Sequence, residues 1–158
     1  MLAGRGPAVQ FSKYETPAEC AANLERHLDG LLRDGVSPSE VTILSPRPFA
    51  ESSVRLLSGR IRGSVREVTA TSAASFPPPA ITFAQIEHFK GLENNYVAVI
   101  DIDRFTETER DLALVYVAMS RARAGLWVAY HANLEREIAA AGARNLAATA
   151  ATEASADG

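Results

Sequence analysis

The sequence predicts an α/β domain with a mainly parallel sheet, and three observations lead to this fold class. Apolar runs alternate with segments of helical periodicity along the 158 residues. The apolar runs are nearly continuous, which is typical of strands that are buried on both faces of a sheet. The composition, with 47% hydrophobic and 22% charged residues, is ordinary for a globular domain with one hydrophobic core.

The first predicted helix has clear boundary signals. Thr16 can cap its N-terminus, Pro17 suits the first helical position, and Glu19 completes a capping box. Gly35 is the expected stop. The residues between these signals place an apolar face at helical spacing, which comprises Ala21, Leu24, Leu28, Leu31 and Leu32.

The remaining elements follow from shorter patterns. One or two helical turns are expected at 86–89, immediately before Gly91. Three further helices are predicted at 49–57, 110–123 and 133–141. Gly125 is expected to end the helix at 110–123. Strands are expected at 9–11, 41–44, 65–68, 80–83, 96–102 and 126–130.

The predicted fold indicates where ligands would bind and how the chain divides. Ligands of parallel α/β sheets meet the carboxyl ends of the strands. The candidate edge is therefore formed by the loops after Leu44, Phe83, Ile102 and Tyr130. Residues 9–141 are expected to form one domain, between a flexible segment at 1–8 and an alanine-rich tail at 142–158 that is expected to be disordered.

Charge and cysteine content exclude several function classes. The net charge is −3, whereas a domain that binds DNA alone usually carries a basic surplus, so any nucleic-acid contact is expected to be local or shared. Cys20 is the single cysteine, which excludes an internal disulfide and a cysteine-based metal site. The histidines lack ligand spacing, so no metal site is predicted. No membrane span or signal peptide is recognised, and a cytoplasmic location is expected.

A first block with chemical potential lies at Phe89–Glu93 (FKGLE). Lys90 and Gly91 follow a strand and a short helical turn, where they can bring a cation and bare backbone close to a phosphate. Glu93 could accept hydrogen bonds from a ribose hydroxyl. The block also fits a plain helix C-terminus, in which Lys90 complements the helix dipole and Gly91 is the left-handed cap.

A second block lies at Tyr116–Arg123 (YVAMSRAR) and places Arg121 and Arg123 at the end of a predicted helix. Arginine suits the charge on a transferring phosphoryl group because its planar fork matches phosphate oxygens. Side chains two residues apart on a helix point in different directions, so only one of the two is expected to reach a given phosphate. Two cations in a last helical turn could also simply complement the helix dipole.

In this order, with a buried strand between them, the two blocks resemble the C-terminal motor domain of UvrD-like superfamily-1 DNA helicases. The resemblance covers roughly residues 9–141, with its specific part at 81–130. It implies a RecA-like, P-loop-NTPase-type three-layer sandwich. Because no GxxxxGK[ST] motif occurs in the chain, the domain lacks its own phosphate loop and carries at most half of a site for ATP with Mg²⁺. The phosphate loop is expected on a partner, the N-terminal helicase domain.

The resemblance implies a role for each matching residue. Lys90 and Gly91 would lie near the phosphates of ATP, and Glu93 near its ribose. Arg121 matches the arginine finger, which reaches the γ-phosphate from across the cleft between the two halves. Arg47 lies about one residue out of register with another phosphate-contacting arginine of the family and is a further candidate.

The chain departs from the family where that family grips DNA. The family usually carries Thr and His five and three residues before the lysine that Lys90 matches. Here those positions are Gln85 and Glu87, with His88 one place late. Gln85 and His88 are therefore the candidate contacts to single-stranded DNA, whereas Glu87 would repel a phosphate.

Other conspicuous residues are interpreted as structural. Asp101 and Asp103 end a strand and are expected to be solvated loop residues rather than metal ligands. Cys20 is expected to be a small buried residue of the first helix, and Trp127 a core residue rather than a platform for base stacking.

The sequence thus predicts the C-terminal motor half of an ATP-dependent DNA helicase, inactive as an isolated chain. An alternative from a different class is a non-catalytic helicase-like module, or a split subunit, that binds a partner protein. The acidic charge and the missing Thr and His favour that alternative. A domain for an unrelated nucleotide would need a glycine-rich loop after its first strand, but Gly4-Arg5-Gly6 precedes that strand.

Overall fold

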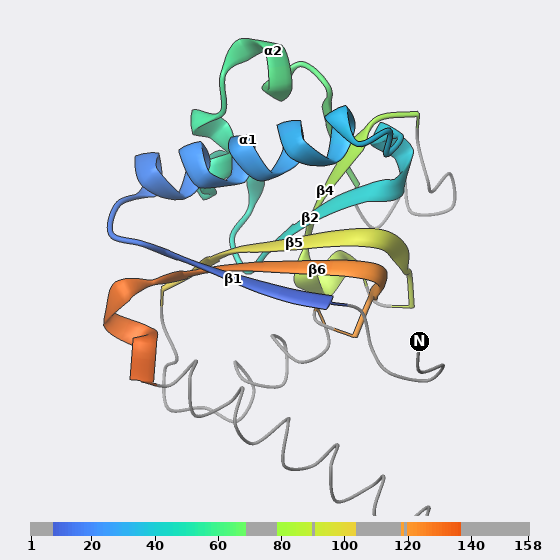
Figure 1. Cartoon of the computed structure of the whole chain (residues 1–158). Coiled ribbons are helices and arrows are strands. Elements are labelled where there is room, and N and C mark those ends of the chain that lie inside the picture. The colour runs from blue at the N-terminus through green and yellow to red at the C-terminus, as the bar shows by residue number, and fades with distance from the viewer. Residues whose placement is uncertain (1–7, 69–78, 90, 104–117, 119, 137–158) are drawn as a thin grey trace, which may run out of the picture.

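A six-stranded sheet forms the centre of the computed structural model, which describes residues 8–68, 79–89, 91–103, 118 and 120–136. The strand order is β1-β6-β5-β2-β4-β3, and each described pair runs parallel (Figure 1). The predicted fold class, an α/β fold with a mainly parallel sheet, is confirmed. The strands are β1 (Ala8–Tyr14), β2 (Val41–Ser45), β3 (Val65–Glu67), β4 (Ile81–Gln85), β5 (Asn94–Ile102) and β6 (Ala122–His131).

Because the strands are parallel, their ends define two opposite edges of the sheet. We call the side where β2, β5 and β6 begin the amino edge; their first residues are Val41, Asn94 and Ala122. We call the side where β2, β4 and β5 end the carboxyl edge; their last residues are Ser45, Gln85 and Ile102. Along β5 the two edges are about 26 Å apart, at a rise of roughly 3.3 Å per residue.

Helix α1 (Pro17–Arg33) forms where the sequence predicts it and covers one face of the sheet (Figure 1). The Oγ1 atom of Thr16 accepts a hydrogen bond from the backbone N–H of Glu19 at 3.1 Å, which is the predicted cap. Gly35 follows the helix with φ +93°, a conformation that glycine adopts without strain. The strong start and stop signals therefore placed this helix correctly.

Two apolar clusters, one on each face of the sheet, form the core. The cluster on the α1 face includes Leu24, Leu28, Ile43, Ile100 and Trp127. The cluster on the opposite face includes Leu44, Phe89, Val97, Val99 and Val128. Burial on both faces explains why these strands read as continuous apolar runs. The core positions predicted for Cys20 and Trp127 are confirmed.

The helix predicted at 49–57 is wrong. This segment forms two 3₁₀ helices, Phe49–Glu51 and Ser53–Leu56, separated by Ser52. The Oγ atom of Ser52 caps the second of them and also donates a hydrogen bond to Asp101 at 2.6 Å. These two interactions hold Ser52 in an extended conformation, which interrupts the helix.

The other short helical elements agree with the sequence in part. The turns expected at 86–89 form a 3₁₀ helix, Ile86–Phe89. Helix α2 (Gly59–Arg62) has no counterpart among the predicted elements. A 3₁₀ helix at Ala132–Leu134 overlaps the start of the last predicted helix, whose residues from 137 onward lie outside the described part. Among the helices described, none has the length and apolar character that crossing a membrane requires.

The helix predicted at 110–123 does not extend to its expected end. Most of it, residues 110–117 and 119, lies outside the described part of the chain. Arg121 lies in a turn, and β6 already begins at the next residue. Gly125 is therefore not a helix stop. It lies within β6, where a Cβ atom would come 2.9 Å from Cδ1 of Tyr96, so the glycine makes room for that ring.

His27 of α1 makes a pH-dependent contribution to stability. Its ring stacks on Trp127 of β6, with ring centroids 5.0 Å apart and planes inclined by 9°. Burial lowers the pKa of His27 from 6.5 to about 4. Unfolding returns this pKa towards 6.5, so the unfolded state binds more protons within this interval. The contribution of His27 to stability is therefore fully present above pH 6.5 and falls as the pH decreases towards about 4.

We predict that His27→Phe reduces the slope of the unfolding free energy against pH between pH 6.5 and about 4. The reduction should correspond to the uptake of at most about one proton on unfolding. Phenylalanine keeps the stacked ring but cannot titrate. Urea unfolding at several pH values within the interval measures the effect. His88→Gln, which changes an exposed histidine, serves as the control and should follow the wild type. Identical pH dependence in the wild type and His27→Phe would contradict the prediction.

Candidate functional site

The pairing of β5 with β6 brings the two chemical blocks together at the amino edge. Asn94 pairs with Ala122, so the residues that precede the two strands lie side by side. The backbone N–H of Asn94 donates a hydrogen bond to the carbonyl oxygen of Arg121 at 3.0 Å. Glu93 and Arg121 are 28 residues apart in sequence (121 − 93), yet they occupy the same edge of the sheet.

Gly91 gives this edge a stretch of bare backbone. It follows the 3₁₀ helix Ile86–Phe89 and has φ +78°, the left-handed conformation that favours glycine. The chain then turns into β5, and the N–H of Leu92 donates to the carbonyl of Phe89 at 3.1 Å. A Cβ atom at Gly91 would meet no atom within 4 Å, so the position faces open space. This geometry fits both the capping role and the approach of a ligand.

Arg123 and Glu93 form an ion pair at the amino edge. The Nε atom of Arg123 donates to Oε2 of Glu93 at 3.3 Å, and the two side chains are 61% and 51% exposed. An ion pair this exposed contributes little to stability, typically ~0–1 kcal/mol. Arg123 lies in β6 rather than at a helix end, so the interpretation that it complements a helix dipole is wrong.

Arg121 occupies a different environment from Arg123. Its side chain is half-buried, and its Nε atom is buried without a hydrogen-bond partner among the described residues. The N–H of Arg121 donates to the carbonyl of Ala118 at 3.1 Å, which holds the turn. The two arginines therefore differ in their contacts: Arg123 pairs with a carboxylate, whereas Nε of Arg121 is buried without a partner among the described residues.

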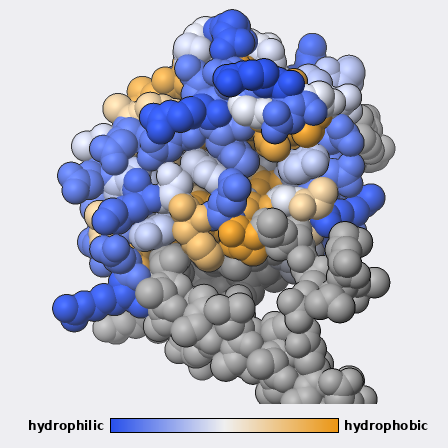
Figure 2. All heavy atoms as spheres, viewed as in Figure 1, coloured by the Kyte–Doolittle hydropathy of each residue, from blue (hydrophilic) through white to orange (hydrophobic). Residues whose placement is uncertain are grey.

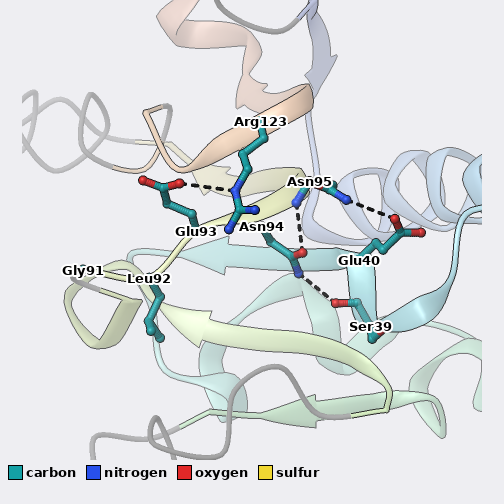
Figure 3. A pocket seen from close by; sticks show the side chains of 8 residues that line it. All are labelled: Ser39, Glu40, Gly91, Leu92, Glu93, Asn94, Asn95 and Arg123. Atoms are coloured by element: carbon teal, nitrogen blue, oxygen red, sulfur yellow. Dashed lines mark hydrogen bonds and ion pairs between the residues drawn. The ribbon is translucent and has the colours of Figure 1, made fainter.

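An open pocket of about 670 Å³ lies at the amino edge. Arg123 reaches down from β6 between Glu93 and the two asparagines that begin β5 (Figure 3). The lining combines a carboxylate, a guanidinium and bare backbone, which suits a ligand with both hydroxyl and anionic groups. The lining residues are Ser39, Glu40, Gly91, Leu92, Glu93, Asn94, Asn95 and Arg123.

Asn94 is a residue of this site that sequence reasoning missed. Its side chain is buried, and Nδ2 donates to the carbonyl of Ser39 at 3.1 Å and to Oγ1 of Thr42 at 3.0 Å (Figure 3 shows the first bond). Together with the backbone bond to Arg121, these contacts fasten the start of β5 to β2 and to the turn before β6. Asn94 lies just before the strand predicted at 96–102, and its buried amide has no signal in a single sequence.

The carboxyl edge carries a separate polar cluster around Asp101. This residue is only 4% exposed and has φ +62°. Its carboxylate accepts hydrogen bonds from the Oγ atoms of Ser45 at 2.6 Å, Ser52 at 2.6 Å and Ser53 at 2.5 Å, and from the N–H of Ser53 at 3.1 Å. The interpretation of Asp101 as a solvated loop residue is therefore wrong, because these donors replace water.

The Asp101 cluster also affects two neighbouring side chains. Burial, followed by the negative charge of Asp101, raises the pKa of the Cys20 thiol to about 12. Burial also raises the pKa of the Tyr14 phenol, and Cys20 and Asp101 add to this effect. Both groups stay protonated at neutral pH, so Cys20 is not a reactive thiolate.

Arg47 lies at the carboxyl edge, away from the other predicted nucleotide-binding residues. Its guanidinium pairs with Asp103, and its backbone N–H donates to Oγ of Ser45 at 3.0 Å. Arg47 follows β2, whereas Glu93 and Arg121 precede β5 and β6, so strand direction separates them. The structure does not bring Arg47 together with Glu93, and the expectation that the candidate site gathers at the carboxyl ends of the strands is wrong.

One of the two candidate nucleic-acid contacts, Gln85, lies away from the amino-edge pocket. Gln85 ends β4 at the carboxyl edge and pairs in register with Ser45. His88 lies on the 3₁₀ helix that follows and is exposed. Lys90 lies outside the described residues. Within the described ranges, no group of three or more His, Cys, Asp or Glu side chains could hold a metal ion.

Comparison with known proteins identifies the segment that carries both blocks. Residues 81–129 match the family model of the UvrD-like helicase C-terminal domain. The match includes Gly91, Glu93, Arg121 and Arg123. The resemblance predicted from the sequence is therefore confirmed over this segment. A search of curated proteins found no significant match.

The fold is similar to that of a solved helicase domain. The crystal structure of the C-terminal domain of a possible DNA helicase from Lactobacillus plantarum WCFS1 superposes with a TM-score of 0.54. The alignment has 20% sequence identity and covers 81% of this chain and 75% of the other. At this identity the likeness establishes the fold alone.

The Asp101 cluster yields a prediction about stability. Asp101→Asn should lower the unfolding free energy by about 1–3 kcal/mol, because an amide NH₂ group would face serine hydroxyls that now donate to a carboxylate oxygen. Asparagine tolerates the left-handed conformation, so the change tests the hydrogen bonds rather than the backbone. Asp103→Asn, which breaks a partly exposed pair, should cost less than ~1 kcal/mol. Equal losses in the two variants, measured by urea unfolding, would contradict this account.

Proposed function

We propose that this chain is the C-terminal motor half of an ATP-dependent DNA helicase. In the complete enzyme, ATP with Mg²⁺ would lie in a cleft between two RecA-like halves. The other half would supply the phosphate-loop lysine and the carboxylate that holds Mg²⁺. This half would present its amino edge to the nucleotide and stabilise the charge on the γ-phosphate. The family match over residues 81–129 supports this proposal.

The unpaired Nε donor of Arg121 is the observation that carries the proposal. A buried donor without an acceptor costs about 1–3 kcal/mol, and native structures rarely leave one without a reason. A phosphate group brought by the other half would supply the acceptor and would match the guanidinium geometry. Since Arg123 is already paired with Glu93, Arg121 is the arginine of the two for which the described residues supply no carboxylate partner.

The remaining residues take roles that follow from their positions. Gly91 would let the chain approach the nucleotide, and Glu93 would accept a hydrogen bond from its ribose. We keep Lys90 as a phosphate contact because it directly precedes Gly91 in the sequence. Arg47 is withdrawn from the nucleotide site, since a ligand at Glu93 would have to extend about 26 Å along β5 to reach it. Gln85, at the carboxyl edge, and His88 remain the candidate contacts to single-stranded DNA.

The rival function is a helicase-like module that binds a partner protein without catalysis. The net charge of −3 favours it, because a strand-binding surface usually needs a local basic surplus. The two proposals differ in what happens when a phosphate-loop half is added. A motor half would complete an ATPase, whereas an interaction module would bind its partner and leave turnover unchanged.

We predict that the purified chain does not hydrolyse ATP, because no phosphate-loop motif occurs in it. Combined with a helicase N-terminal half that carries the phosphate loop, it should support DNA-stimulated turnover. Arg121→Lys should then reduce kcat by about 10³-fold, since a point charge replaces the fork that meets the γ-phosphate. A steady-state ATPase assay measures both effects.

Arg66→Lys provides the matched control. Arg66 is an exposed residue of β3, at the far end of the sheet from β6, and its replacement should leave kcat unchanged. Steady turnover by the isolated chain that Arg121→Lys abolishes would refute the division of the site between two halves. An unchanged kcat for Arg121→Lys in the combined enzyme would refute the role of this arginine.

A further inference from the structure

The ion pair between Arg123 and Glu93 leaves several of its polar atoms without a hydrogen bond within the described residues of the pocket. Arg123 uses its Nε atom for Oε2 of Glu93. Within the described part of the chain, neither its two terminal Nη atoms nor Oε1 of Glu93 makes a hydrogen bond. The pair therefore offers two donors from a cation and one acceptor from a carboxylate, all beside the bare backbone of Gly91 (Figure 3).

The side chains of Glu40 and Asn94, two other polar residues of the pocket, are already occupied. The two carboxylate oxygens of Glu40 accept from the N–H of Ser37 at 2.9 Å and from Nδ2 of Asn95 at 3.0 Å. The side-chain nitrogen of Asn94 donates to β2 and the preceding turn, and its side-chain oxygen accepts from the N–H of Asn95 at 2.9 Å. A polar ligand would therefore find its unoccupied side-chain partners mainly on the Arg123–Glu93 pair.

We propose that Arg123 and Glu93 act as one recognition unit for a ribonucleoside phosphate. Oε1 of Glu93 accepts the hydrogen bond from a ribose hydroxyl that the proposed function already assigns to this residue, while the two Nη atoms of Arg123 donate to two phosphate oxygens of the same ligand. This inference rests on the proposed function, in which a nucleotide meets the amino edge. It adds Arg123 as a nucleotide-binding residue, separate from Arg121 and its γ-phosphate.

The chemistry of the pair supports this division of roles. A guanidinium is planar, so a bond from Nε to Glu93 fixes its plane and directs the outer edge with both Nη atoms away from that carboxylate. That edge matches two phosphate oxygens. The pair is more than half exposed, so it contributes little to folding. Removing either member should therefore leave the fold intact and change ligand binding alone.

Titration of the ¹⁵N-labelled chain with ADP and with adenosine tests the proposal by NMR. The amide signals of Gly91, Glu93 and Asn95 report on the pocket. The wild type should bind ADP more tightly than adenosine. Arg123→Gln should weaken ADP about tenfold, the loss of roughly one charge-assisted contact, and should leave adenosine binding nearly unchanged. Arg60→Gln, which breaks a pair with Asp29 on α1, is the control and should bind both ligands as the wild type does.

Glu93→Gln tests the other half of the unit. It should weaken ADP and adenosine by a similar factor, because both carry the ribose. With 2′,3′-dideoxyadenosine 5′-diphosphate, which lacks the ribose hydroxyls, Glu93→Gln should bind no more weakly than the wild type. A Glu93→Gln effect that persists with the dideoxy nucleotide would refute the ribose contact.

The remaining outcomes separate this inference from the proposed function. If ADP shifts the pocket signals and Arg123→Gln binds it as tightly as the wild type, the recognition unit is refuted while the nucleotide-facing edge stands. If neither ADP nor adenosine shifts those signals at millimolar concentration, the amino edge does not bind nucleotide in this chain, and both proposals lose their support at this pocket.

Discussion

The site depends on the parallel pairing of β5 with β6 and on the hydrogen bond that begins it. The N–H of Asn94 donates to the carbonyl of Arg121, which sets the residues before the two strands next to each other. In a parallel pair, the residues at the starts of both strands lie on the same edge of the sheet. This edge therefore brings together two segments that are distant in sequence, Gly91–Glu93 and Arg121–Arg123. The side chain of Asn94, bonded to β2, fixes this edge to the centre of the sheet.

The two edges of the sheet differ in how far their charged side chains are buried and paired. At the amino edge, the Arg123–Glu93 pair is exposed and Nε of Arg121 is buried without a partner among the described residues. The unpaired Nε is costly for stability, and both features leave atoms for a ligand. At the carboxyl edge, Asp101 is buried under three serine hydroxyls and Arg47 is paired with Asp103. These contacts tie the loop after β2 to the end of β5. The carboxyl edge is therefore largely satisfied internally, whereas the amino edge has atoms left for a ligand.

The sequence predicted the sheet and α1 because their signals are local: apolar runs, a threonine cap and a left-handed glycine. The family resemblance assigned the γ-phosphate contact to Arg121. The sequence could not show that Arg123 pairs with Glu93, because that contact joins residues 30 positions apart. Asp101 was misread because burial of a carboxylate depends on serines far away in the chain. Gly125 was misread because the need for space beside Tyr96 looks the same in sequence as a helix stop.

A crystal structure of this chain joined to a phosphate-loop half, with Mg²⁺ and a non-hydrolysable ATP analogue, tests the account most directly. The account places the guanidinium of Arg121 within hydrogen-bond distance of the γ-phosphate, with the ribose beside Glu93. A nucleotide whose phosphates contacted Arg47 at the carboxyl edge, with Arg121 still buried against its own domain, would contradict it.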